Sequence, residues 1–105
     1  MPSVPDFPPF NTTERIPVAI DFTNGLPAGD SVASIVGVSL SVYLGTDPNA
    51  ASLLVFSPGL SGNVVSQFIN VGAVPGVTYR ITMTVQTTLG ATLSLYSHIF
   101  CAPIN

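Results

Sequence analysis

Residues 77–100 constrain the fold most, because their side chains alternate between apolar and polar types. Along residues 77–86, five apolar side chains at odd positions alternate with five polar side chains at even positions. Successive side chains of a β-strand point to opposite sides of the sheet, so this period of two predicts a strand with one buried face. Leu89 and Gly90 interrupt the alternation, which resumes over residues 91–100. The stretch therefore predicts a long β-hairpin whose turn contains Leu89 and Gly90.

An isolated hairpin is only marginally stable in water, so the rest of the chain must supply a covering sheet. Turn residues recur at intervals of about 8 to 14 residues, and no segment shows the 3.6-residue period of a helix. We therefore expect an all-β chain that forms a single immunoglobulin-like antiparallel β-sandwich of six to seven strands, with a small barrel as the alternative. Besides the two arms of the hairpin, the expected strands are 17–23, 31–44, 53–56 and 62–71.

Three of these strands carry more specific expectations. Pro58 and Gly59 are expected to end the short strand before them, because proline cannot donate a ladder hydrogen bond. The segment 62–71 is apolar on both faces, which predicts contact with a neighbouring protein as well as with the core. The alternation through 31–44 predicts an inward row at Val36, Val38, Leu40, Val42 and Leu44.

Residues 1–16 are rich in proline, and we expect them to form an extended arm ahead of a β-sandwich domain at residues 17–105. Proline fixes φ and lacks an N–H group, so this segment can be neither a helix nor a central strand. Val4, Phe7 and Phe10 are spaced three apart, which places them on one edge of a polyproline helix with three residues per turn. The arm then either lies against its own sandwich or a neighbouring protein, or forms a disordered tail.

Charged residues make up only 7% of the chain, against about 25% in typical soluble domains. Arg15 and Arg80 are the only basic residues apart from one histidine, and the net charge is −3, so we expect no binding to DNA or RNA. No apolar run approaches the roughly 20 residues that span a membrane, and no signal peptide is visible, so we expect cytoplasmic synthesis and no membrane contact. The scarcity of charge favours a surface buried against other subunits over a neutral monomeric domain.

No constellation of residues predicts catalysis, a cofactor or a metal site. His98 is the only histidine, and Cys101 lies three positions further on, so on a strand the two side chains would point to opposite faces. We expect the single cysteine to be a small buried hydrophobe. The aspartates at strand ends and in turns are expected to accept hydrogen bonds from nearby backbone N–H groups. The sequence therefore predicts a protein without enzymatic activity.

Three segments carry a joint motif: FTNGLPAGDSVAS at 22–34, GNVVSQFINVG at 62–72, and VPGVTYRITMTVQTTLGATLSLYSHIF at 74–100. Together they resemble small β-sandwich virion proteins of tailed bacteriophages, of the fibre–tail adaptor or head–tail accessory type. The resemblance covers most of residues 20–100. It implies a structural protein of the virion that links the tail or its neck to fibres or adjacent rings. A capsid decoration protein and a free-standing carbohydrate- or protein-binding module are the alternatives.

The partners of such a protein would be other structural proteins of the virion, and the chain itself would be a homo-oligomer in a symmetric assembly. If the long hairpin lies at the edge of its sheet, a strand of a neighbour could also pair with it. The candidate contact residues combine the apolar side of the arm with the outward rows of the hairpin: Val4, Phe7, Phe10, Thr78, Arg80, Thr82, Thr84, Tyr96, His98 and Phe100.

Overall fold

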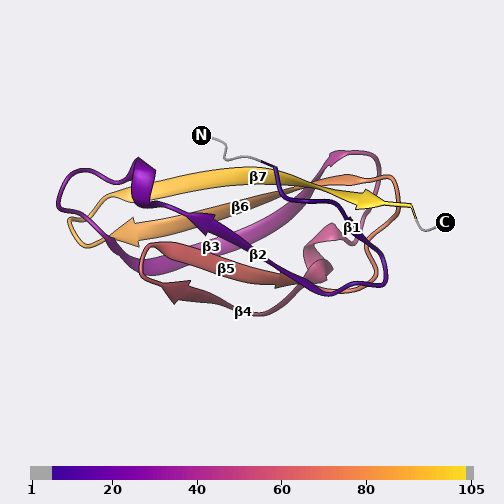
Figure 1. Ribbon diagram of the computed structural model, residues 1–105, viewed down its shortest axis with the longest axis horizontal. Helices are drawn as coiled ribbons and strands as arrows, with labels where there is room; N and C mark the ends of the chain where they lie inside the picture. The colour runs from indigo at the N-terminus through magenta and orange to yellow at the C-terminus, as the bar shows by residue number, and fades with distance from the viewer. Residues whose placement is uncertain (1–5, 104–105) are drawn as a thin grey trace.

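The alternating stretch forms a long antiparallel hairpin in the computed structural model, which describes residues 6–103 (Figure 1). Its strands are β6 (Thr78–Thr87) and β7 (Thr92–Ala102), which pair in continuous register. Gly90 takes a φ of 94° in the connecting turn, a left-handed conformation that glycine adopts without strain. The predicted hairpin and the position of its turn are confirmed.

Within residues 6–103, two β-sheets contain all the strands (Figure 1). The four-stranded sheet has the order β1-β7-β6-β3, and the three-stranded sheet has the order β2-β5-β4. None of the helical turns in this part of the chain is long and apolar enough to cross a membrane. The other elements are β1 (Phe10–Asn11), β2 (Ile16–Asp21), the 3-10 turn η1 (Thr23–Gly25), β3 (Val32–Leu44), the 3-10 turn η2 (Ala50–Leu53), β4 (Leu54–Ser61) and β5 (Val64–Ile69).

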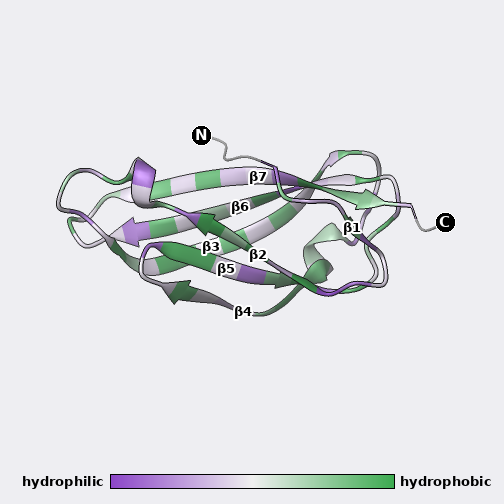
Figure 2. Cartoon of the chain, in the orientation of Figure 1, coloured by the Kyte–Doolittle hydropathy of each residue, from purple (hydrophilic) through white to green (hydrophobic). Residues whose placement is uncertain are grey.

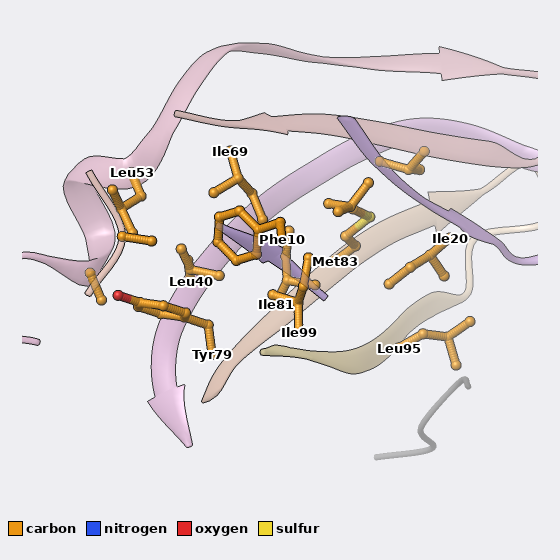
Figure 3. Packing of buried hydrophobic residues seen from close by; sticks show 14 of the residues in the cluster. Phe10, Ile20, Leu40, Leu53, Ile69, Tyr79, Ile81, Met83, Leu95 and Ile99 are labelled. Atoms are coloured by element: carbon orange, nitrogen blue, oxygen red, sulfur yellow. The ribbon is translucent and has the colours of Figure 1, made fainter. Parts of the chain in front are cut away.

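The two sheets share one cluster of buried apolar side chains (Figure 3). Ile81 and Met83 of β6 are 0% exposed, as is Ile69 of β5 from the other sheet. Burying a side chain of this size contributes roughly 1.5–3 kcal/mol, so the inward rows hold the two sheets together. Figure 2 shows the alternation that produces these rows as green and pale bands along β7 and β3. The protein is therefore an all-β sandwich.

The hairpin lies within the four-stranded sheet, with strands on both sides. β3 pairs with β6 along one side, and β1 pairs in parallel with the end of β7 on the other. The condition that the hairpin lies at a sheet edge is therefore not met by β6, whereas β7, which pairs with β6 on one side, has a second paired strand only at Cys101 and Ala102 within the described residues. The outward rows of the hairpin form part of a broad sheet surface.

β3 departs from the regular alternation that the sequence predicts. Its pairing with β6 shifts register at three places, one of which skips Val36 and another of which precedes Leu44. Such β-bulges insert an unpaired residue and redirect the side chains around it. Val36 and Leu44 are consequently 61% and 60% exposed, so the prediction that they face inward is wrong. Leu40, between the two irregularities, is buried as predicted.

Pro58 and Gly59 do not end β4, which continues to Ser61. The pairing of β4 with β5 breaks after Val55 and resumes at Gly59, and within the break Phe56 has a φ of 64°. β4 is an edge strand of its sheet, where no neighbour requires the missing N–H group of proline. The predicted end of this strand is wrong because the chain accommodates the proline in an irregular section and then pairs again.

Residues 6–11 lie along the end of β7. The N–H of Phe7 donates a hydrogen bond to the carbonyl of His98 over 3.1 Å, and β1 follows as a short parallel strand. Phe10 is 3% exposed and belongs to the core cluster (Figure 3), whereas Phe7 is half-buried at its margin. Phe10 is thus out of reach of a partner, in contrast to its prediction as a contact residue. Val4 lies outside the described residues.

Tyr79 ties the start of β6 to two loops. Its hydroxyl donates a hydrogen bond to Oδ2 of Asp47 over 2.7 Å and accepts one from the N–H of Val74 over 2.9 Å. The residue is 0% exposed. Burial, and then the hydrogen bond to the Asp47 carboxylate, raise the pKa of Tyr79 far above its ordinary value. The hydroxyl therefore stays protonated while it bridges the two loops.

We expect Phe10→Ala to lower the free energy of unfolding by about 3–5 kcal/mol, because removing the ring leaves a cavity in a packed core. Denaturant titration followed by circular dichroism measures this loss. Phe7→Ala, a change on the same segment but at its half-buried side chain, is the matched control and should lower the free energy of unfolding less. A loss for Phe10→Ala below about 1 kcal/mol, or one no larger than that of Phe7→Ala, would contradict this prediction.

We expect Tyr79→Phe to lower the free energy of unfolding at pH 7 by about 1–3 kcal/mol, because the Val74 N–H and the Asp47 carboxylate each lose a partner. The raised pKa of Tyr79 means that its contribution is complete below the unfolded value of about 10 and declines as the pH rises above it. The deficit of the variant should therefore narrow above about pH 10.

Denaturant titrations of wild type and Tyr79→Phe between pH 7 and pH 11 test this prediction. Tyr43→Phe, at a half-exposed ring whose hydroxyl makes no hydrogen bond to a described residue, is the control and should change stability by less than about 0.5 kcal/mol. A deficit for Tyr79→Phe that stayed constant above pH 10 would contradict the assignment.

Candidate protein–protein interface

The side of the four-stranded sheet that points away from the core, which we call the outer face, gathers most of the predicted contact residues. The register places Arg80 of β6 opposite His98 of β7, and Thr82 opposite Tyr96. All of these side chains are partly buried or exposed, because their neighbours in sequence point into the core. The predicted residues on this face are Thr78, Arg80, Thr82, Thr84, Tyr96, His98 and Phe100.

β3 adds further residues to the outer face. Ser39 and Ser41 lie opposite Thr82 and Arg80 of β6. Tyr43 is 48% exposed, and its ring stacks on the His98 imidazole with the two centroids 4.0 Å apart. The sequence places Tyr43 on the outward side of its strand, but its contact with β7 residues depends on the pairing of β3 with β6. The sequence does not predict that pairing, so the expected contact residues do not include Tyr43.

Arg80, Tyr43, Tyr96 and His98 form one group near the start of β6 on the outer face, which we call the Arg80 cluster. The guanidinium carbon lies 4.9 Å from the centroid of the Tyr43 ring and 4.6 Å from that of Tyr96. Nε of Arg80 donates a hydrogen bond to Nε2 of His98 over 3.2 Å. Two cation–π contacts and one hydrogen bond thus fix the guanidinium on the sheet.

His98 connects this cluster to the N-terminal segment. Because Nε2 accepts a hydrogen bond from Arg80, the proton of the neutral ring lies on Nδ1. Nδ1 is 3.7 Å from Oδ1 of Asp6, whose side chain is 74% exposed. The imidazole therefore lies between the Arg80 guanidinium at Nε2 and the Asp6 carboxylate at Nδ1, and these two groups orient the ring.

A hollow of about 380 Å³ opens beside the Arg80 cluster, between the N-terminal segment and the sheet. Phe7 lines it from one side, and Tyr43 and Phe100 line it from the other. Its wall combines aromatic carbon with few polar groups, which suits an apolar or aromatic side chain of a partner. The remaining lining residues are Asp6, Pro9, Leu44, Thr78 and His98.

Hydroxyl groups occupy the outer face toward the turn of the hairpin. The hydroxyls of Thr84 on β6 and Ser94 on β7 share a hydrogen bond of 2.7 Å across the strands. Thr82 lies between this pair and the Arg80 cluster. Hydroxyls both donate and accept, so this part of the face can contact another protein without bringing any charge to the contact.

The acidic side chains of the described residues are occupied in loops. Oδ1 of Asp30 accepts hydrogen bonds from the Thr88 hydroxyl and the Leu89 N–H, so it ties one loop to the turn of the hairpin. Burial acts to raise the pKa of Asp30, but these and neighbouring hydrogen bonds outweigh it, so that pKa lies below its ordinary value. The other pairs are Asp6 with His98, Glu14 with the Asn11 N–H, Asp21 with Thr23, and Asp47 with Tyr79 and Asn49.

Catalytic or metal-binding groups do not converge in the part of the chain that the structure describes. No group of three histidine, cysteine, aspartate or glutamate side chains that could hold a metal occurs among residues 6–103. Cys101 is 0% exposed, and burial raises the pKa of its thiol. His98 lies on the outer face while Cys101 points into the core, so the two do not form a nucleophile pair.

The outward side of the three-stranded sheet has a different character. Phe56 and Phe68 are 62% and 40% exposed, and their rings meet edge to face with centroids 5.7 Å apart. Arg15 lies over the Phe56 ring at 5.3 Å, and its Nε donates to Oδ1 of Asn70 over 3.0 Å. This surface, which we call the phenylalanine face, lies on the opposite side of the sandwich from the outer face.

A double-mutant cycle tests whether the Arg80 cluster is coupled in the isolated protein. We expect Arg80→Gln and Tyr96→Leu to show a coupling of about 0.5–1 kcal/mol in the free energy of unfolding, because each removes the same cation–π contact. The control cycle combines Arg80→Gln with Phe56→Leu on the phenylalanine face. Its coupling should be below about 0.5 kcal/mol, and additive effects in both cycles would contradict the geometry of the cluster.

Comparison with known proteins identifies the family to which the chain belongs. A search of curated proteins found no match to the chain. The model of the family described as "Podophage GP4 fiber-tail adaptor protein gp77" matches residues 11–95. This match includes β2 to β6 and the first residues of β7, and with them Tyr43 and Arg80 of the outer face. The match covers most of the chain, so the protein belongs to the family of podophage fibre–tail adaptors and is a structural component of the virion.

Proposed function

We propose that the protein joins the podophage tail to its fibres through protein–protein contacts and that the outer face is one of its contact surfaces. The observation that carries this proposal is the Arg80 cluster, which lies on the outer face of a chain that belongs to an adaptor family. Arginine and tyrosine are among the residues that contribute most to binding at protein interfaces. The surrounding hydroxyls are neutral, as at the centre of an interface depleted of charge.

An adaptor contacts two proteins, and the sandwich has two chemically different sides. The phenylalanine face offers Phe56 and Phe68, which expose aromatic carbon to solvent. Exposed aromatic groups of this kind mark interaction surfaces when they lie together. We propose that the outer face and the phenylalanine face bind different partners, so that the thickness of one sandwich separates the two.

We also infer that the sandwich is immunoglobulin-like. In that fold, strands C, F and G form one sheet and strands B, E and D lie in the other. The orders β3-β6-β7 and β2-β5-β4 correspond to these sheets when β2 to β7 are taken as B to G. Tyr79 at the start of β6 bonds to the backbone N–H of Val74, five residues upstream, as in the tyrosine corner of strand F. Both features support the assignment.

Several copies of the chain are proposed to act together in the particle. Most homo-oligomers have closed symmetry, in which each copy offers the same surfaces to its neighbours. With only 7% charged residues, this chain can bury much of its surface without stranding unpaired charges. Light scattering on the purified protein measures whether the copies associate before they reach the tail.

Deleting the gene from the parent phage tests the proposed function. We expect particles with complete heads and tails but without fibres in electron micrographs, and expect wild-type protein to restore the fibres. Thr82→Arg places a long cation at the centre of the outer face and should fail to restore them. Asn24→Arg, at an exposed position in η1 away from both faces, is the control and should restore them.

Normal fibres on the deletion particles would refute the adaptor role. Restoration by Thr82→Arg at the wild-type level would refute the assignment of the outer face. Labelled protein found on the capsid and absent from the tail would favour a capsid decoration protein instead.

A further inference from the structure

We propose that Arg80 forms an ion pair with an aspartate or glutamate side chain of the partner protein. This pair determines which surface of the partner the outer face binds. This inference rests on the proposed function, since it names the chemistry by which the outer face would bind its partner.

The charge of Arg80 is not neutralised within the described residues. The Asp6 carboxylate lies beside Nδ1 of His98, and the other described carboxylates are held by N–H and hydroxyl groups in loops. Only Nε of Arg80 is used, in its hydrogen bond to His98, whereas its two terminal nitrogens make no hydrogen bond to a described residue. Those terminal nitrogens carry four N–H donors, and a carboxylate can accept from two of them at once.

The guanidinium is held in place before any partner arrives. The rings of Tyr43 and Tyr96 lie 4.9 Å and 4.6 Å from the guanidinium carbon, and His98 holds Nε. Arg80 is itself half-buried in this cluster. A long side chain that is already ordered loses less conformational freedom on binding, so the arrangement favours affinity for a carboxylate.

The surroundings of Arg80 favour a carboxylate on a protein over a polyanion. Ser41 and Thr82 are neutral neighbours, the Asp6 carboxylate lies beyond His98 at its Nδ1, and Arg15 lies on the phenylalanine face. A single cation on a chain with net charge −3 does not make the extended positive field that nucleic acid requires. One fixed guanidinium beside a hollow with an aromatic wall instead matches an acidic side chain followed by an apolar one.

The absence of lysine from the chain makes this proposal directly testable. Arg80→Lys introduces a single side-chain amine at the proposed contact, and Arg15→Lys introduces one on the opposite side of the sandwich as the matched control. Each variant is added to particles of the deletion phage and treated with a water-soluble carbodiimide. This reagent joins an amine to a carboxylate in contact with it as an amide, with no added spacer, and mass spectrometry identifies the joined peptides.

We expect the amine of Arg80→Lys to be joined to an aspartate or glutamate of a tail or fibre protein, and the amine of Arg15→Lys not to be joined to that residue. We also expect Arg80→Gln to bind the deletion particles about 30-fold more weakly than wild type, and Arg15→Gln to bind within about twofold of it. Circular dichroism of each variant confirms that the weaker binding does not come from unfolding.

Binding of Arg80→Gln at the wild-type level would overturn the proposal while leaving the adaptor function intact, because the protein would still join the particle. Bound Arg80→Lys that is not joined to any carboxylate would overturn it as well. Particles that carry Arg80→Gln normally but no longer attach to host cells would assign Arg80 to a host surface group instead. Failure of the wild-type protein to bind the particles would refute the proposed function itself.

Discussion

β6 is paired along both of its sides, and the rest of the molecule is arranged about it. Its inward row, from Tyr79 to Val85, is completely buried and meets the three-stranded sheet, while its outward row lies at the centre of the outer face. A slip of one residue in either pairing would exchange these two rows and expose the core. The apolar row therefore decides which side chains of β6 form the outer face. The Arg80 cluster is held by the same constraint, because its members lie on β3, β6 and β7.

The hairpin could be predicted from sequence because its alternation is uninterrupted and its turn contains a glycine. The inward row of β6 and the burial of Cys101 follow from that period alone. The bulges of β3 could not be predicted, because they depend on pairing with β6, and they decide that Val36 and Leu44 are exposed and that Tyr43 reaches His98. The continuation of β4 past Pro58 depends on its place at a sheet edge. The position of Phe10 in the core depends on parallel pairing between the two ends of the chain.

The few charges of the chain are divided between two uses. Acidic side chains such as Asp21, Asp30 and Asp47 accept hydrogen bonds in loops and turns, where they hold the ends of strands together. The two arginines lie on aromatic rings on opposite sides of the sandwich. The acids are thus used within the fold, whereas each arginine keeps donors that the fold does not use. The few charged side chains of this protein therefore lie at specific structural positions, the acids in loops and turns and the arginines on aromatic rings.

The alternation along β6 also bears on how such a protein can diverge. Odd-numbered residues of this strand are fixed by the core, whereas even-numbered residues contact little besides their neighbours on the outer face. Substitutions at Thr78, Thr82 or Thr84 therefore change the surface with little effect on packing. Under the proposed function, the outward residues of β6 can change together with the surface of a partner protein while the inward residues preserve the fold. Selection for core packing and selection for partner binding then act on alternate residues of the same ten-residue strand without opposing each other.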